Sequence, residues 1–157
     1  MEIEMGLEQA KEHLKKYGLA EQITELSESS ATVELAAKAL GCEPERIAKT
    51  LSFFAGEEAI LVVTAGDKKI DNAKYRHTFG TKAKMIPAEL VEETIGHPVG
   101  GVCPFGIREG VKVYLDVSLK EYQTVFPACG SANSAIELTP EELEKCSGMQ
   151  EWVDVCK

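Results

Sequence analysis

Apolar residues recur every three or four positions in several stretches of the chain, a spacing that predicts amphipathic helices. In the first stretch, Leu7, Ala10 and Leu14 would share one buried face, and Gly18 follows as a stop signal. Further helices are indicated by capping residues at their starts or glycines at their ends. The expected helical segments are residues 6–17, 31–40, 71–79, 87–94 and 139 onward, with one more turn at 44–47.

Oxygen-bearing side chains are expected to begin three of these helices, because they can accept hydrogen bonds from the free N–H groups of a first turn. We predict Ser30 as the N-cap of the second helix, with Glu34 near the capping-box position. Asp71 and Thr139 have the same predicted role, and Pro140 fits the first helical position after Thr139.

Strands are expected where apolar and β-branched residues run together between turn residues. Residues 50–54 and 59–64 flank turn residues at 56–58, a pattern typical of a β-hairpin. The second strand is apolar throughout, as in a central strand that is covered on both faces. Shorter strands are predicted at 22–26, 84–86, 111–117, 124–128, 134–138 and 152–155. The predicted fold class is α/β (α+β), with a mixed, largely antiparallel sheet flanked by helices.

Length and composition fit a single globular domain that covers residues 1–157. The hydrophobic share is 44% and the charged share 27%, which is ordinary for such a domain. No apolar run approaches the length of a membrane span, and the acidic start of the chain is unlike a signal peptide. The five cysteines are widely spaced and form no C-x-x-C motif, so we expect reduced thiols in a cytoplasmic protein without a membrane partner.

The charge is unevenly distributed along the chain. The formal net charge of −9 argues against a protein that binds polyanions over its whole surface. Residues 66–84 nevertheless hold six basic residues against two acidic ones, a local charge of +4. Such a segment could dock a short piece of phosphate backbone, although a helix face in solvent can have the same composition.

The most unusual segment is 96–106, which holds four glycines and two prolines in eleven residues. Prolines fix φ and lack an N–H, whereas glycines allow positive φ and close approach to the main chain. A rigid loop of this kind can direct backbone N–H groups at an oxygen-rich ligand. The same composition also suits a buried tight connection without a ligand.

Two kinds of side chain in the sequence could carry chemistry. Lys49 stands just before the apolar strand that begins at Thr50, where an ammonium can bind a phosphate or polarise a carbonyl oxygen; the alternative is a lysine that reaches solvent. Cys103 and His97 suggest a thiol nucleophile as another alternative, but spacing does not establish its geometry. Because a zinc site would lack two further ligands at motif spacing, we expect neither a metal nor another cofactor.

Three blocks occur in order along the chain: RIAKTL at 46–51, GDKKID at 66–71 and GHPVGGVCPFG at 96–106. Together they resemble the YbaK/EbsC family of free-standing aminoacyl-tRNA deacylases, which are similar to the editing insertion domain of bacterial prolyl-tRNA synthetase. The resemblance runs from about Ala31 to the end of the chain. It implies the fold of that editing domain and hydrolysis of the ester that joins a wrong amino acid to the 3′ end of a tRNA, usually tRNA for proline.

The resemblance also assigns roles to residues of this chain. Lys49 matches the family's functional lysine, and residues 100–104 match its Gly-x-x-x-Pro loop, whose main chain holds the terminal adenosine and the ester. The resemblance implies that water, or a group of the substrate itself, attacks the positioned carbonyl carbon without a protein nucleophile. The expected catalytic residues are Lys49, Gly100 and Gly101. The expected substrate-binding residues are Thr50, His97, Val102, Cys103, Pro104, Phe105, Gly106, Ser131 and Asn133.

The implied partners are the acceptor end of a mischarged tRNA and prolyl-tRNA synthetase. The residues expected to contact the acceptor stem are Lys68, Lys69, Lys74 and Arg76.

Cysteine-specific members carry a serine and an aspartate where this chain has Ala128 and Ala135, and the polar residues nearby are instead Ser131, Asn133 and Ser134. The amino acid removed from tRNA is therefore expected to be cysteine, alanine or another small amino acid. The alternative function is a non-catalytic module of the same fold that binds tRNA or an aminoacyl-like ligand.

Overall fold

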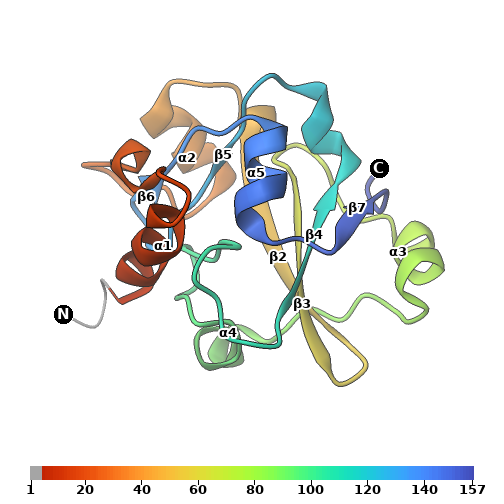
Figure 1. Ribbon diagram of the computed structural model, residues 1–157. Coiled ribbons are helices and arrows are strands. Elements are labelled where there is room, and N and C mark those ends of the chain that lie inside the picture. Colours follow the sequence, from red (N-terminus) through yellow and green to blue (C-terminus); the bar gives the residue numbers. More distant parts are fainter. Residues whose placement is uncertain (1–4) are drawn as a thin grey trace.

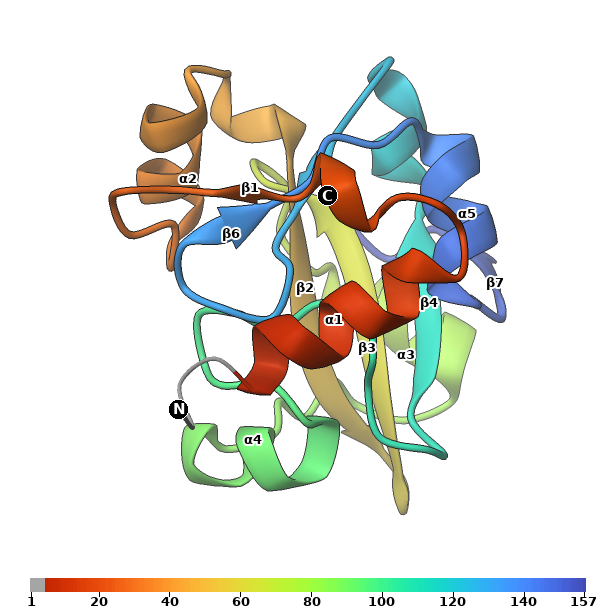
Figure 2. The same cartoon turned by 60° about the vertical axis from the view of Figure 1, so that its left-hand side comes forward.

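A five-stranded mixed sheet forms the centre of the computed structural model, which describes residues 5–157 (Figure 1). Its strand order is β5-β2-β3-β4-β7, and a second sheet pairs β1 with β6 (Figure 2). The strands are β1 (Thr24–Glu25), β2 (Ile47–Ala55), β3 (Glu58–Ala65), β4 (Lys112–Asp116), β5 (Phe126–Pro127), β6 (Ser134–Ala135) and β7 (Glu151–Val153).

Within residues 5–157, five α-helices and three short 3-10 turns surround the sheets, close to where the apolar spacing predicts helices. The helices are α1 (Met5–Lys15), α2 (Val33–Leu40), α3 (Asn72–Phe79), α4 (Ala88–Ile95) and α5 (Pro140–Ser147). The 3-10 turns are Ala20–Gln22, Pro44–Arg46 and Val117–Glu121. The predicted caps of α3 and α5 are confirmed, because Asp71 accepts hydrogen bonds from two N–H groups and Thr139 forms a full capping box.

The sheet is mixed, as predicted, and its longest ladder is the antiparallel pairing of β2 with β3. The description as largely antiparallel is true of this hairpin, whereas the pairs β2–β5, β3–β4 and β4–β7 are parallel. Parallel pairs need crossover connections, and here α3 and α4 lie between β3 and β4 while α5 lies between β4 and β7. Apolar patterns locate such strands but do not specify the direction of their partners.

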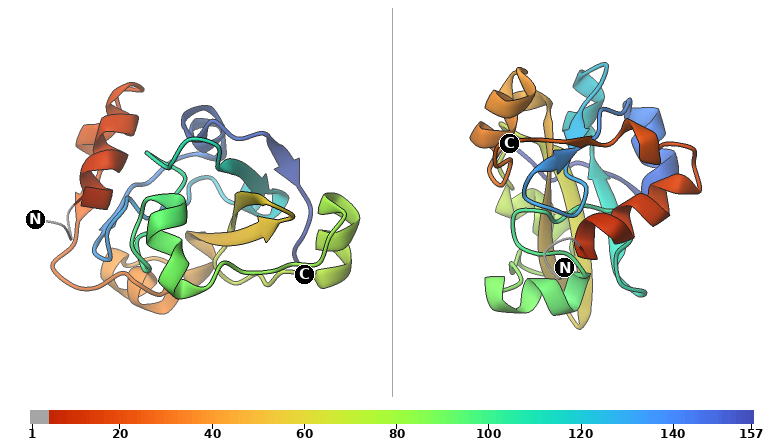
Figure 3. Two further views of the ribbon diagram at one scale, coloured as in Figure 1. Left: turned by 90° about the horizontal axis from the view of Figure 1, so that it is seen from below. Right: turned by 90° about the vertical axis from the view of Figure 1, so that its left-hand side faces the viewer.

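The central strand β3 separates two apolar layers. Its residues Leu61 and Val63 pack in the layer that includes buried residues of α1 and α5. Ile60 and Val62 pack in the other layer with Tyr75 of α3. Helices α1 and α3 therefore lie on opposite faces of the sheet (Figure 3). The prediction of a central strand that is covered on both faces is confirmed.

Helix α2 begins two residues later than predicted. Its N-cap is Thr32, whose hydroxyl accepts a hydrogen bond from the Leu35 N–H, and not Ser30. The N–H of Ser30 instead donates to the Ala132 carbonyl at 2.6 Å. This long-range pairing keeps Ser30 out of the helix and leaves its side chain only 8% exposed.

Replacing Thr139 with alanine tests the capping box of α5. The Thr139 hydroxyl accepts from the Glu142 N–H at 3.1 Å, and the Glu142 carboxylate accepts from the Thr139 N–H at 2.9 Å. We expect Thr139→Ala to lower the free energy of unfolding by about 1 kcal/mol, the usual loss at an N-cap. Urea unfolding followed by Trp152 fluorescence measures it. The control Thr78→Ala, at an exposed position of α3, should change it by less than about 0.5 kcal/mol; equal losses would contradict the assignment.

Candidate functional site

An interruption in the outer edge of β2 creates the candidate site. Near the start of β2, residues 47–48 pair with β5. Near its end, two backbone hydrogen bonds of 2.9 and 3.1 Å join residues 52–54 to the segment 84–86. Among the residues that the structure describes, no backbone hydrogen bond covers this edge at residues 49–51. The sheet edge is therefore open for three residues between two covered ends.

The alternation of an antiparallel strand determines which main-chain groups face this opening. The Ser52 carbonyl and the Phe54 N–H point outward, because both bond to the segment 84–86. Thr50 stands two residues before Ser52, so its N–H and carbonyl point to the same side. The opening thus presents one main-chain donor and one acceptor to whatever occupies it.

A cavity of about 460 Å³ lies against this opening. Its walls come from β2, the start of α2, the segment 85–91, the glycine-rich loop and the segment 126–135. Most of the side chains that face it are apolar. The polar residues of the lining include Ser30, Lys49, Thr50 and Ser134, and its small or apolar residues include Met85, Val99, Gly100, Val102, Ala128 and Ala135.

Lys49 lies inside β2 and not before it, because β2 begins at Ile47. Its ammonium donates to the Gly66 carbonyl at 3.3 Å and also to the Lys68 carbonyl. Burial lowers the pKa of this ammonium, and nearby acidic groups such as Asp67 oppose the change. The two carbonyls replace part of the lost hydration and hold the charge at the cavity wall.

The glycine-rich loop reaches the cavity through Gly100, which has φ +93°, and through Val102. Gly101 is not among the residues that line the cavity, and its N–H closes a turn onto the Pro98 carbonyl at 2.9 Å. A Cβ at Gly101 would stand 2.6 Å from the main-chain nitrogen of Ser131. Glycine is therefore required at this position for close packing of two loops, and not for contact with a ligand.

The other predicted residues of the loop lie behind the cavity wall. Cys103 Sγ is 3.5 Å from His97 Nε2, which also lies 2.6 Å from the Phe105 carbonyl. Burial raises the pKa of Cys103 to about 12 and lowers the pKa of His97. This pair has neither the thiolate nor the access that a nucleophile needs. The predicted residues in this second layer are His97, Cys103, Pro104, Phe105 and the half-buried Gly106.

Ser131 and Asn133 also support the wall instead of lining it. The Ser131 hydroxyl donates to Asn133 Oδ1 at 3.0 Å and lies 2.6 Å from Ser134 Oγ. Asn133 is exposed, and its amide donates to the Leu26 carbonyl at 3.1 Å. Ser134 is the member of this group that faces the cavity.

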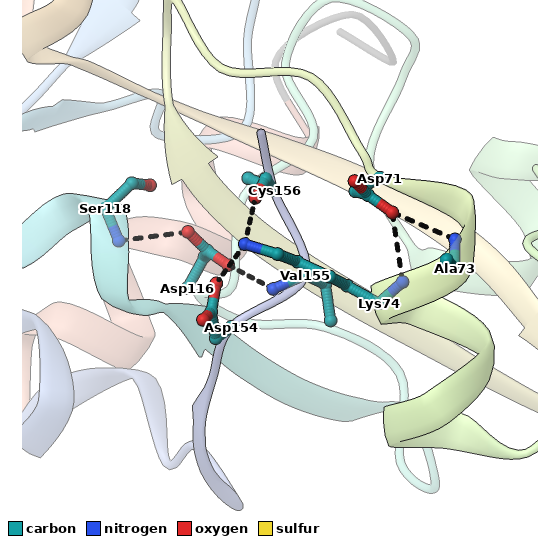
Figure 4. A network of polar contacts seen from close by, with 8 residues as sticks. All are labelled: Asp71, Ala73, Lys74, Asp116, Ser118, Asp154, Val155 and Cys156. Atoms are coloured by element: carbon teal, nitrogen blue, oxygen red, sulfur yellow. Dashed lines mark hydrogen bonds and ion pairs between the residues drawn. The ribbon is translucent and has the colours of Figure 1, made fainter.

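The four predicted RNA-contact residues lie on the segment that follows β3. Lys69 and Arg76 are exposed, and Lys68 is half-buried. The ammonium of Lys74 donates to a carboxylate at 3.2 Å and to a main-chain carbonyl at 2.9 Å, both on the last residues of the chain (Figure 4). The structure therefore gives Lys74 a partner within the protein.

Ser30 is a polar cavity residue that the sequence analysis did not assign to the site. Ser30 and Thr50 both line the cavity, and their hydroxyls are buried without a hydrogen-bond partner within residues 5–157. A buried hydroxyl without a partner is unfavourable, so this pair marks where polar groups of a ligand would fit. The serine-rich run before α2 was the available signal, but a serine at that place is more often an N-cap.

Further features limit the chemistry of the described chain. All five cysteines are free thiols. No group of three or more His, Cys, Asp or Glu side chains within residues 5–157 is placed to hold a metal ion. None of the helices in that range is long and apolar enough to cross a membrane.

Comparison with known proteins identifies the kind of domain that carries this cavity. A family model described as the aminoacyl-tRNA editing domain matches residues 27–146. The uncharacterized protein YwhH of Bacillus subtilis strain 168 is 56% identical over 155 residues, 98% of each chain. A proline–tRNA ligase of Thermosipho melanesiensis is 30% identical over 125 residues, which are 79% of this chain but only 22% of the ligase.

A solved structure supports the same assignment. The crystal structure of a protein proposed to be a trans-editing enzyme for prolyl tRNA synthetase superposes with a TM-score of 0.87 and 29% identity, over 97% of both chains. The matched family segment includes β2, the glycine-rich loop and the segment 126–135, which together form most of the cavity wall. The chain therefore belongs to the aminoacyl-tRNA editing domain family.

Proposed function

We propose that the protein is a trans-editing hydrolase that deacylates mischarged aminoacyl-tRNA, specifically tRNA for proline that carries cysteine, alanine or another small amino acid. The observation that carries the proposal is the cavity itself. Lys49, the open main chain at Thr50 and the glycine-rich loop meet around one hollow, in a chain of the editing family.

The reaction adds water to the carbonyl carbon of the aminoacyl ester. The bond from that carbon to the ribose oxygen then breaks, the amino acid leaves with a carboxyl group, and the ribose regains its hydroxyl. An aminoacyl ester is already activated, so positioning and stabilisation of the developing oxyanion can supply most of the acceleration. The Lys49 ammonium and the outward N–H of Thr50 are the groups suited to that charge.

The lining favours a small, uncharged amino acid. Ala128 and Ala135 face the cavity from paired positions, since an antiparallel bridge joins them. Neither offers a carboxylate or a hydroxyl to a substrate side chain. Recognition of the amino acid would therefore depend on size and apolar contact, which suits alanine and cysteine and excludes large side chains.

Contact with tRNA would come from the basic segment 66–84, which begins at the carbonyls that hold Lys49. Of the four predicted contact residues, Lys69 and Arg76 are exposed and form no ion pair within residues 5–157. An otherwise acidic chain would repel the rest of the RNA, so binding would concentrate near the acceptor end. Similarity to proline–tRNA ligases supports prolyl-tRNA synthetase as the cellular context.

Replacing Lys49 with alanine tests the proposed enzyme. Loss of one donor to a developing oxyanion lowers the rate by about 10²–10³, so we expect Lys49→Ala to slow deacylation by that factor. The assay measures amino acid released from tRNA for proline charged separately with alanine, cysteine and serine. The control is Lys145→Ala, at an exposed position of α5, which should keep the wild-type rate.

The same assay separates the enzyme from the non-catalytic alternative. Wild-type protein that binds a non-hydrolysable aminoacyl-adenosine analogue but releases no amino acid from any of the three tRNAs would be a binding module. Repeated turnover on any of them would exclude that alternative.

Ser30→Ala tests whether the unpartnered hydroxyl contacts substrate. One lost hydrogen bond of about 1 kcal/mol would lower kcat/KM about five- to tenfold. The free energy of unfolding should stay unchanged or rise, because the hydroxyl has no partner in the free protein. Steady-state deacylation and urea unfolding measure the two effects, with the exposed Ser27→Ala as control. A loss of stability without a change in kcat/KM would show a structural role instead.

A further inference from the structure

We propose that residues 154–157, together with Lys74, fix the loop whose two carbonyls accept hydrogen bonds from Lys49, and so position this lysine for reaction. The inference rests on the proposed function for its catalytic meaning. It assigns Lys74 a positioning role inside the protein, and it gives a function to a segment that lies outside the matched family region 27–146.

The two hydrogen bonds that hold the Lys49 ammonium both end on one loop, residues 66–70. Its Gly66 and Lys68 carbonyls accept hydrogen bonds from the Lys49 ammonium. An ammonium has three N–H donors, so two are used by the loop and one remains for another acceptor. If the loop moved, the direction of that third donor would change with it.

Residues 155–157 pair with the end of this loop, at residues 69–71. Lys157 N–H donates to the Lys69 carbonyl at 2.9 Å, and Lys69 N–H donates back to Lys157 at 3.4 Å. An antiparallel bridge joins Ile70 to Cys156. At the far end, the N–H of Asp71 donates to the carbonyl of residue 155 at 2.8 Å.

The segment is in turn fixed to the sheet by the buried Asp116, which is 1% exposed. One carboxylate oxygen accepts from the Val155 N–H at 2.9 Å, and the other accepts from the Ser118 N–H at 2.9 Å (Figure 4). The Ser118 hydroxyl accepts from the Ala65 N–H at 3.1 Å. Ala65 immediately precedes Gly66. The start of the loop 66–70 and the segment that pairs with its end are therefore both linked to the Asp116 carboxylate.

Lys74, on α3, adds two further bonds to residues 154–157. Its ammonium donates to the Cys156 carbonyl at 2.9 Å and to the Asp154 carboxylate at 3.2 Å (Figure 4). The ion pair with Asp154 is exposed and therefore weak, whereas the bond to the carbonyl is charge-assisted and fixes a main-chain atom. Lys74 thus acts on Lys49 through residue 156, the loop and its two carbonyls.

The test compares Lys74→Met with Lys74→Arg. Methionine keeps the length and helix propensity of the side chain but cannot donate, so we expect kcat for deacylation to fall about tenfold while KM changes less than about twofold. Lys74→Arg should recover most of kcat. A second variant, Lys157→Pro, removes the N–H that bonds to Lys69 and should lower kcat in the same way.

A readout independent of activity is the chemical accessibility of Lys49. Reductive methylation followed by peptide mass spectrometry gives its rate relative to the exposed Lys145 of the same molecule. We expect this ratio to rise several-fold in Lys74→Met and Lys157→Pro and to return toward the wild-type value in Lys74→Arg. Thermal unfolding checks that each variant is folded.

The outcomes are distinct. An unchanged Lys49 methylation ratio in both folded variants overturns the inference. A raised KM with an unchanged kcat and methylation ratio in Lys74→Met also overturns it, and would place Lys74 at the RNA. A raised methylation ratio in a protein whose wild type deacylates no tRNA supports the positioning role and removes the proposed function.

Discussion

The open edge at residues 49–51 of β2 is the constraint on which the rest of the site depends. An uncovered sheet edge normally invites pairing with another chain. Here both neighbouring stretches of the same edge are covered, by β5 and by the segment 84–86. The remaining gap is too short for a strand to dock and is enclosed by walls. It can therefore serve as a small recognition site with main-chain groups already fixed in direction.

The loops that form the walls of the gap pack main chain against main chain. At the contact points they lie so close that a side chain would not fit between them. A Cβ at Gly101 would meet Ser131, and a Cβ at Gly130 would stand 2.2 Å from the Gly6 carbonyl. The glycine-rich loop, the segment 126–135 and α1 thus form one close-packed unit. Rigidity at the cavity comes from this packing, so the glycines serve chiefly as spacers. Only Gly100 of the proposed catalytic pair faces the hollow.

Local features of the fold could be predicted, because they depend on residues near in sequence. The caps at Asp71 and Thr139 belong to this class, as does the β2–β3 hairpin. Ser30 was misinterpreted because a distant partner, Ala132, decides its conformation. Lys49 could be singled out from its place beside an apolar strand and from the family resemblance, but the carbonyls that hold it could not be foreseen. Hydrogen bonds to main-chain carbonyls distant in sequence leave no pattern in side-chain types, and neither does the direction of a parallel partner.

The electrostatics of the site follow from the same arrangement. A half-buried ammonium loses hydration, which lowers its pKa, and an apolar cavity cannot compensate. Carbonyl dipoles can, without adding a negative charge that would neutralise the lysine or repel a phosphate. A carboxylate partner for Lys49 would instead neutralise its charge and repel a phosphate. Under the proposed function, the acidic remainder of the chain would keep RNA from binding elsewhere, and a single ammonium with neutral partners would attract the acylated end locally.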